Sequence, residues 1–402
     1  MTKRRSKKKE SGFRAFLRRI GTIISFLIVG IAALIGVITG GLVEVDENTN
    51  PDTTQNTSPN IGNTRTLTFS QGYGAERDFW QVYFTAPTGS TDRRTYTGGV
   101  DTALVQAING VQRTLDIAAF EWNNPALTNA VIDAHERGVR VRMVVDDEHA
   151  LEDEDSTIED VIDAGVRVVD DGRSGLMHNK FMIMDSTSVW TGSMNYTVNG
   201  TYRNNNNILM LRARRAVEAY QAEFNEMFDQ RQFGSNRSAV NKAEFVQDGV
   251  PVEIIFAPED RVLDEMVAEL SQARERIRFM QFSFTEDVIG DVLLDRAAAG
   301  VAVEGIFEVR GSETQFSEMP RLICAGLDMR QDGNSFTFHH KVFIVDNQTV
   351  LTGSFNTSAN ATNGNDENMV IIKDPDIVAL YIAEYDRMKT RATRPNRSEF
   401  SC

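Results

Sequence analysis

Two stretches of the sequence carry the same polar residues at the same spacing. Residues 178–195 read HNKFMIMDSTSVWTGSMN and residues 339–356 read HHKVFIVDNQTVLTGSFN, so both fit H-x-K-x4-D-x6-G-S-x-N. The pattern is filled by His178, Lys180, Asp185, Gly192, Ser193 and Asn195 in the first copy, and by His339, Lys341, Asp346, Gly353, Ser354 and Asn356 in the second. An imidazole acts as nucleophile or proton carrier at neutral pH, an ammonium group neutralises anionic oxygens, and an amide orients them. This combination suits a phosphoryl centre, where one imidazole attacks phosphorus and the other protonates the leaving oxygen.

The local pattern predicts how each copy presents these groups. The apolar runs FMIM and VFIV indicate strands, so His and Lys, two residues apart, share one face. The adjacent His340 is turned to the opposite face and is not expected to be catalytic. A polar turn and a second short strand then bring the G-S-x-N turn back beside the His. Its Gly permits close backbone approach, and its Ser and Asn supply neutral donors.

The two copies belong to a larger internal duplication. The offset between matching residues is 161 from His178 onward, far longer than the period of a solenoid repeat. In each half helical and strand patterns alternate, which predicts an α/β architecture with a largely parallel or mixed sheet. Helices are expected over 101–112, 124–138, 264–277 and 286–300, each followed by a strand.

The N-terminal segment has the composition of a membrane anchor. Residues 1–19 carry nine Lys or Arg against one Glu, and residues 20–43 contain no charge. An uncharged run of this length spans a bilayer core, and the basic flank places the N-terminus in the cytoplasm. A cleaved signal peptide is the alternative, but the run is long and no A-x-A site follows. The polar residues 44–66 are expected to form a disordered linker.

The charge of the remaining chain bears on its partners. The formal net charge is −15, and with +8 on residues 1–19 the rest carries −15 − 8 = −23. A protein that binds nucleic acid normally shows a basic stripe, and none is visible. The acidic run 146–160 is interpreted as a solvated loop and helix start, since it lacks the spacing of an EF-hand calcium loop.

The chain contains only two cysteines, Cys324 and Cys402. No disulfide framework is therefore expected to support the fold, and no CxxC spacing suggests a structural zinc site. Cys324 is interpreted as a small buried apolar residue, and Cys402 as free.

The doubled motif resembles the HKD signature of the phospholipase D superfamily, and the resemblance extends over about residues 67–390. It implies two tandem α/β sandwich halves, 67–240 and 250–395, each a mixed central sheet flanked by helices, related by pseudo-twofold symmetry. It also implies one active site at their seam and a covalent phosphohistidine, formed without metal or cofactor. By this resemblance the two histidines are nucleophile and general acid. The residues implied to hold the phosphate are Lys180, Lys341, Ser193, Asn195, Ser354 and Asn356. Asp185 and Asp346, with Gly192 and Gly353, are interpreted as structural.

The resemblance also implies an acidic residue that orients a histidine. Glu367 stands at this position in the second half, whereas Asn206 stands there in the first. Because the partner comes from the opposite half in the family, we expect Glu367 to contact His178, which would make His178 the nucleophile and leave His339 as the acid. If Glu367 instead contacts His339, the two roles are exchanged. The loss of the acid at Asn206 also leaves an inactive duplicate as an alternative.

The motif specifies the chemistry more closely than the substrate. A membrane-anchored phospholipase D with an extracytoplasmic domain agrees best with the anchor and the acidic charge. The alternatives are an endonuclease, a phosphatidyl transferase of the cardiolipin synthase type, and a non-enzymatic scaffold. A phospholipid membrane is the expected partner, nucleic acid is disfavoured, and no obligate protein partner is implied.

Overall fold

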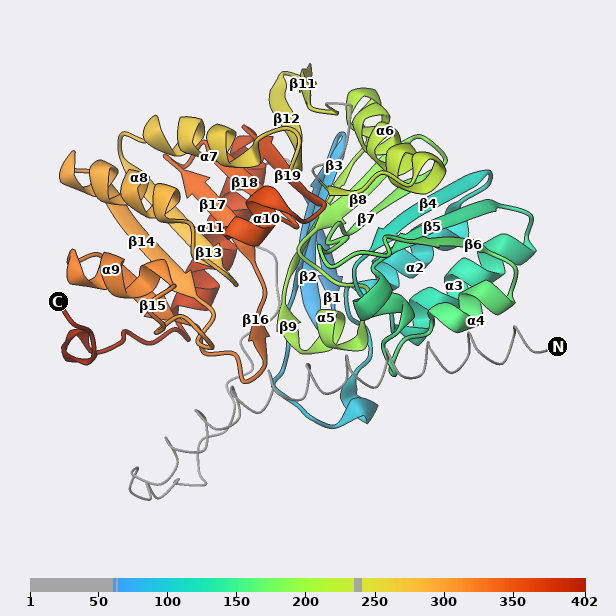
Figure 1. Cartoon of the computed structure of the whole chain (residues 1–402), viewed down its shortest axis with the longest axis horizontal. Coiled ribbons are helices and arrows are strands. Elements are labelled where there is room, and N and C mark those ends of the chain that lie inside the picture. The colour runs from blue at the N-terminus through green and yellow to red at the C-terminus, as the bar shows by residue number, and fades with distance from the viewer. Residues whose placement is uncertain (1–60, 63, 235–240) are drawn as a thin grey trace, which may run out of the picture. The chain divides into compact units, whose positions relative to one another are not determined.

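The computed structural model describes residues 61, 62, 64–234 and 241–402. The predicted basic segment 1–19 and transmembrane helix 20–43 lie outside these residues, as does most of the linker 44–66. Among the described residues, no helix has the length and apolar character needed to cross a membrane. Each half of the duplicated sequence forms one large sheet with helices packed against it (Figure 1).

The first sheet has the order β1-β2-β3-β10-β8-β7-β4-β5-β6. Its strands are β1 (Arg65–Phe69), β2 (Gly72–Arg77), β3 (Trp80–Thr85), β4 (Thr114–Ala119), β5 (Arg140–Val145), β6 (Arg167–Asp170), β7 (Phe181–Met184), β8 (Ser188–Gly192) and β10 (Asn207–Leu211). Strands β4, β5 and β6 are parallel neighbours, and the other neighbours are antiparallel. The sheet is therefore mixed, as the alternating pattern predicts.

The second sheet repeats this arrangement in the order β11-β12-β19-β18-β17-β13-β14-β15. Its strands are β11 (Ala243–Gln247), β12 (Val250–Ala257), β13 (Arg276–Gln281), β14 (Ala302–Phe307), β15 (Asp328–Gln331), β17 (Lys341–Val345), β18 (Thr349–Gly353) and β19 (Glu367–Ile372). A small parallel sheet, β9 (Asn204–Asn205) with β16 (Thr337–Phe338), joins the two halves.

The helices pack against the two sheets and enclose three hydrophobic cores. They are α2 (Asp101–Gly110), α3 (Pro125–Glu136), α4 (Ile158–Asp163), α5 (Val198–Tyr202), α6 (Arg214–Gln230), α7 (Val262–Ser271), α8 (Asp287–Ala298), α9 (Glu318–Cys324), α10 (Ala359–Asn363) and α11 (Pro375–Lys389), with short turns η1 (Arg93–Thr95), η2 (Asp147–Leu151) and η4 (Arg397–Glu399). One core lies between the first sheet and α2, α3 and α4, and another between the second sheet and α7, α8 and α9. The third contains α6, α11 and residues of both sheets, so burial of apolar surface holds the halves together.

The helix expected over 264–277 is shorter than predicted. Helix α7 ends at Ser271, and β13 begins at Arg276. The backbone amides of Arg274, Glu275 and Arg276 donate instead to the carboxylate of Asp346, which starts the strand. A carboxylate 70 residues away in sequence therefore decides this boundary.

The expectation that the fold has no disulfide is wrong. Cys324, the last residue of α9, is bonded to Cys402 across a separation of 78 residues. The C-terminal segment returns to α9, where the Arg397 Nη2 donates to the Cys324 carbonyl oxygen at 2.8 Å. Two cysteines so far apart form no sequence pattern, because their approach depends on the whole second half.

We expect Cys402→Ser to lower the free energy of unfolding by about 2–4 kcal/mol, because the unfolded chain loses a crosslink that restricts it. Denaturant titration followed by circular dichroism measures this difference. Cys324→Ser should give the same loss, since it opens the same loop, and so should reduction of the wild type. Unequal losses in the two variants would contradict a stabilising role for the bond.

Candidate active site

Each motif folds as the predicted hairpin, β7–β8 in the first half and β17–β18 in the second. Gly192 and Gly353 end these hairpins where a neighbouring strand passes very close. A Cβ atom would lie 2.3 Å from the Asn207 carbonyl oxygen at Gly192 and 2.2 Å from that of Asn368 at Gly353. Only glycine fits there, so the turn after it approaches the strand that carries the histidine partner.

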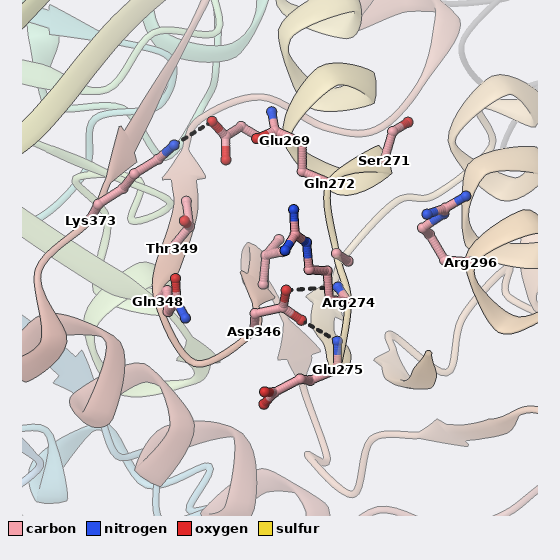
Figure 2. Close-up of a pocket in the computed structure, with 12 residues that line it drawn as sticks. Glu269, Ser271, Gln272, Arg274, Glu275, Arg296, Asp346, Gln348, Thr349 and Lys373 are labelled. Carbon is pink, nitrogen blue, oxygen red and sulfur yellow. Dashed lines mark hydrogen bonds and ion pairs between the residues drawn. The ribbon is translucent and has the colours of Figure 1, made fainter. Parts of the chain in front are cut away.

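Asp185 and Asp346 lie at the far end of the hairpins. Asp346 accepts the backbone amides of Arg274 and Glu275 at 2.7 and 2.8 Å (Figure 2). Asp185 accepts those of Gln112 and Arg113 at 2.9 and 2.7 Å. Burial opposes ionisation, but these hydrogen bonds hold the pKa of both carboxyls below its ordinary value. Both side chains therefore anchor strand starts.

His178 is buried and contacts the opposite half. Its Nδ1 lies 2.7 Å from Glu367 Oε2, the contact expected from the sequence. The His178 backbone amide also donates to the Asp366 carbonyl oxygen at 3.0 Å. Ser354 donates to the same Glu367 oxygen at 2.7 Å.

His339 repeats this arrangement with an amide in place of the carboxylate. Its Nδ1 lies 2.9 Å from Asn206 Oδ1, and its backbone amide donates to the Asn205 carbonyl oxygen at 2.9 Å. Ser193 donates to Asn206 Oδ1 at 2.9 Å. The two histidine sites are thus related by the duplication, and each is completed by the other half.

These partners determine the tautomer of both imidazoles. When Glu367 is ionised it only accepts hydrogen bonds, so His178 then carries its proton on Nδ1. Asn206 Nδ2 donates to the Gly200 carbonyl oxygen at 2.8 Å, which turns Oδ1 toward His339. His339 therefore also donates from Nδ1, and Nε2 of each ring carries a lone pair.

The two motif lysines are buried beside the histidines. Lys180 Nζ donates to the His178 carbonyl oxygen at 2.7 Å, and Lys341 Nζ to that of His339 at 3.2 Å. Burial lowers the pKa of Lys180 to about 8, although Glu367 and other carboxylates oppose it. Burial and the neighbouring Lys180 hold the pKa of Lys341 well below its usual range.

The lysines also affect the other titrating groups. Burial, reinforced by both ammonium groups, places the pKa of His178 and of His339 well below the ordinary value. Burial raises the pKa of Glu367 to about 7, although both lysines oppose it. The site thus gathers four basic side chains in a buried space, where a bound anion would favour their charged forms.

Phe120 and Phe282 are site residues that the sequence reasoning missed. Their rings lie 4.6 and 4.8 Å from His178 and His339, between ring centroids. Lys180 Nζ lies 4.7 Å from the centre of the Phe120 ring, and Lys341 Nζ 4.8 Å from that of Phe282. Phe120 directly follows β4 and Phe282 closely follows β13, so their matching positions in the duplication were the available signal.

Asn195 and Asn356 differ in their contacts. Asn195 Nδ2 donates to Glu121 Oε2 at 2.6 Å, and Glu121 is another residue that sequence reasoning missed. In the second half Ser283 stands at the matching position, directly after Phe282. Nothing in the sequence pattern around Glu121 distinguishes it from an exposed acid at a strand end.

Two further histidines have other environments. His340 is turned away from the motif face, as expected, and its Nε2 lies 3.0 Å from Glu384 Oε1. The centre of the His149 ring lies 4.5 Å from that of Phe120, which also contacts His178. Its hydrogen bond with Asp146 raises its pKa, which favours the charged form of the His149 ring at the edge of the site.

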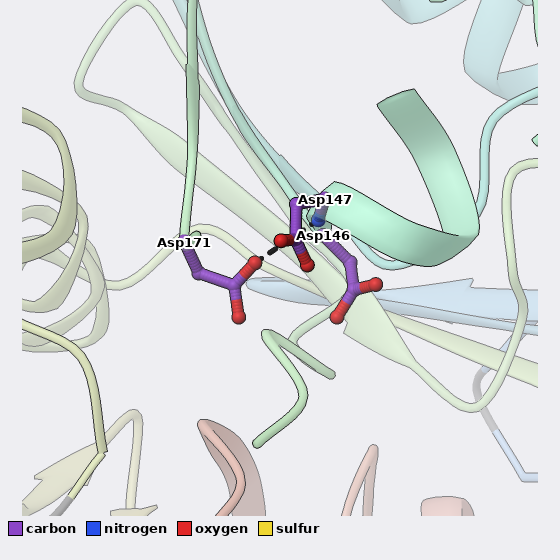
Figure 3. A group of neighbouring side chains, drawn as sticks. All are labelled: Asp146, Asp147 and Asp171. Carbon is purple, nitrogen blue, oxygen red and sulfur yellow. Dashed lines mark hydrogen bonds between the residues drawn. The ribbon is translucent and has the colours of Figure 1, made fainter. Parts of the chain in front are cut away.

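The acidic run contributes carboxylates that lie close together. One carboxylate oxygen from each of Asp146, Asp147 and Asp171, the last from beyond the run, lies within 4.8 Å of the other two (Figure 3). Asp146 accepts the backbone amides of His149 and Met177 at 2.9 and 3.1 Å, and Asp171 accepts that of Asp147 at 3.0 Å. These bonds give the group a structural function in holding the segment that leads into His178.

Comparison with known proteins assigns the family. The family model described as "Cardiolipin synthase, PLD-like domain" matches residues 104–228 and 266–389, once in each half and together over more than half of the chain. The chain therefore belongs to the phospholipase D superfamily.

Two curated relatives and one solved structure illustrate the similarity. A mitochondrial cardiolipin hydrolase of Xenopus tropicalis is 38% identical over 135 residues, 34% of this chain and 64% of the frog protein, which is less than two thirds of its length. A phospholipase D of Rickettsia bellii (strain RML369-C) is 29% identical over 140 residues, 35% of this chain and 70% of that protein. The crystal structure of phosphatidylserine synthase from Haemophilus influenzae Rd KW20 covers 75% of this chain and 86% of its own, at TM-score 0.57 and 14% identity, and shares the fold.

The buried Lys180 should make stability depend on pH. The unfolded chain keeps the ordinary lysine pKa, so above pH of about 8 it binds more protons than the folded chain. The free energy of unfolding should therefore rise by about 2 kcal/mol between pH of about 7.5 and 9.5 through this group alone.

Denaturant titrations across this range test the expectation. Lys180→Met should remove that part of the rise, whereas Ser193→Ala, which alters a buried site residue without a titrating group, should keep it. An identical pH slope in Lys180→Met and the wild type would contradict the assignment.

Proposed function

We propose that this chain is a phosphodiesterase that hydrolyses phospholipid headgroup esters in the manner of a phospholipase D, through a covalent phosphohistidine. The observation that carries the proposal is the pair of imidazoles, each held at Nδ1 by an oxygen from the opposite half, beside two buried lysines. Such a pair supplies a nucleophile and a proton donor to one phosphate.

The first step is attack by His178. Its Nε2 lone pair forms a bond to phosphorus, the bond from phosphorus to the headgroup oxygen breaks, and His339 gives that oxygen a proton. Glu367 stabilises the positive charge that develops on the His178 ring, since its carboxylate lies 2.7 Å from Nδ1. Lys180 and Lys341 neutralise the non-bridging oxygens. In the second step His339 takes a proton from water, the water oxygen attacks phosphorus, and His178 leaves.

Proton balance in this scheme depends on the substrate. Without an anion, burial and the lysines hold the pKa of His339 well below its usual value, so the ring is neutral. A bound phosphodiester brings a negative charge that opposes the lysines and favours a protonated His339.

Ser193 and Ser354 have a positioning function in this proposal. Both hydroxyls are fully buried and donate to the histidine partners Asn206 and Glu367. They also accept the backbone amides of Asn207 and Asn368 at 3.0 Å. Their hydrogen-bonding capacity therefore supports the partners, and we assign the phosphate to the lysines and Asn356.

Several features support a lipid substrate. The relatives named above are a cardiolipin hydrolase and a phospholipase D. The chain after residue 19 is strongly acidic, which disfavours a polyanionic nucleic acid. We propose that residues 20–43 anchor the enzyme, with the catalytic domain outside the cytoplasm. The disulfide agrees with this topology, since disulfides persist in oxidising compartments.

A side-by-side assay tests the proposal. The full chain is incubated, with EDTA present, with phosphatidylcholine vesicles and separately with a labelled single-stranded oligonucleotide. We expect choline release from the vesicles, no nicking of the oligonucleotide, and an acid-labile phosphoenzyme after rapid quenching. His178→Ala should abolish both turnover and phosphoenzyme, whereas His339→Ala should slow turnover by at least about a hundredfold and still label with a substrate that has a nitrophenyl leaving group.

The other outcomes are informative. Labelling of His178→Ala but not His339→Ala would exchange the two roles. Nicking of the oligonucleotide without choline release would contradict a lipid substrate, and loss of activity in EDTA would contradict metal-free chemistry.

A further inference from the structure

The first half contributes a carboxylate to the site that the second half lacks. Glu121 follows Phe120, whose ring contacts His178, and Ser283 follows Phe282, whose ring contacts His339. Glu121 and Ser283 therefore occupy matching positions beside the two histidines.

Glu121 also determines how Asn195 is turned. Its carboxylate accepts a hydrogen bond at 2.6 Å from the Asn195 amide, and a carboxylate only accepts, so Nδ2 must face Glu121. Asn195 Oδ1 then points elsewhere. Asn195 is only 6% exposed, and its Oδ1 has no hydrogen-bond partner among the described residues. A buried carbonyl oxygen without a donor is costly unless a ligand supplies one.

The second half offers no such arrangement. Asn356 Oδ1 likewise has no hydrogen-bond partner among the described residues, but Ser283 replaces the carboxylate that fixes the Asn195 amide. Asn356 is thus free to turn its amide nitrogen toward a phosphate oxygen, while Asn195 is committed to presenting its oxygen. The Glu121 charge reaches the centre of the site, since it opposes the lowering by burial of the pKa of both Lys180 and Lys341.

We propose that Glu121 and the carbonyl oxygen of Asn195 form an acceptor subsite beside the phosphate, which selects lipids whose headgroup carries an ammonium or hydroxyl group. This inference rests on the proposed function. In a phospholipid the headgroup is the part that bears such donors, because the diacylglycerol moiety has none. The same carboxylate would repel the neighbouring phosphate of a nucleic acid strand. Glu121 is therefore a specificity-determining residue for the same reaction.

A matched pair of lipids tests this inference. Phosphatidylethanolamine and phosphatidylpropanol have headgroups of nearly equal size that differ by an ammonium against a methyl group. With each at the same mole fraction in non-ionic detergent micelles, phosphatidic acid release gives kcat/KM for the full chain. We expect the wild type to prefer phosphatidylethanolamine by at least about tenfold, as expected for charged hydrogen bonds. Glu121→Gln keeps an acceptor for Asn195 but removes the charge, and should reduce this ratio by at least about fivefold, because it slows phosphatidylethanolamine cleavage more than phosphatidylpropanol cleavage.

The matched control is Ser283→Ala at the equivalent position of the second half, which should leave the ratio within about twofold of wild type. Equal slowing of both lipids by Glu121→Gln would overturn the inference, because Glu121 would then only position Asn195. A wild-type ratio near one would also overturn it, without any variant, while leaving phospholipase activity intact. Failure of the wild type to cleave either lipid would instead overturn the proposed function and the inference with it.

Discussion

The hydrogen bond between His178 Nδ1 and Glu367 Oε2 is the contact on which the site depends, because its two residues belong to different halves. Its counterpart joins His339 to Asn206 in the opposite sense. Neither half can orient its own histidine, so the duplicated motifs are productive only together. The site therefore requires that the sheets of the two halves be held close enough, and in the right register, for these hydrogen bonds to form.

Several interactions maintain this register. The chain segments that lead to the two histidines lie against the opposite half. They are held there by hydrogen bonds that the backbone amides of His178 and His339 donate. Directly after each histidine partner, Asn207 and Asn368 turn to the other side of their strands. Asn207 donates to Thr352 and Tyr381 at 2.8 and 2.9 Å.

Asn368 accepts from the matching residues of the first half, Thr191 and Tyr220, at 2.7 and 3.0 Å. The bonds are buried, so an unmade one would cost the desolvation of its polar groups. One face of each of these two strands thus binds the opposite half, while the other face orients a histidine.

Much of this arrangement was predictable from the sequence, since it depends on local periodicity and on the constant offset of 161. The spacing within each motif predicts the hairpin and the shared face of His and Lys. The offset matches Glu367 to Asn206 in the sequence, and the family resemblance then predicts that Glu367 contacts His178 of the other half.

The remaining features depend on contacts that no local pattern records. The disulfide needs the C-terminal segment to return to α9, and the end of α7 depends on Asp346. The hydrogen bonds that the Ser hydroxyls donate, and the one between Asn195 and Glu121, depend on three-dimensional placement alone. Sequence reasoning identified the motif residues, but it could not tell which of them contact the substrate and which only position the others.

The central claim is that two motifs build one phosphate site. The most direct measurement is the stoichiometry of binding of tungstate, a phosphate analogue, by isothermal titration calorimetry of the full chain, repeated with His178→Ala and His339→Ala. We predict one tungstate per chain and a loss of binding in either variant. Two tungstate ions per chain, with one retained in each variant, would show two independent sites and contradict the account.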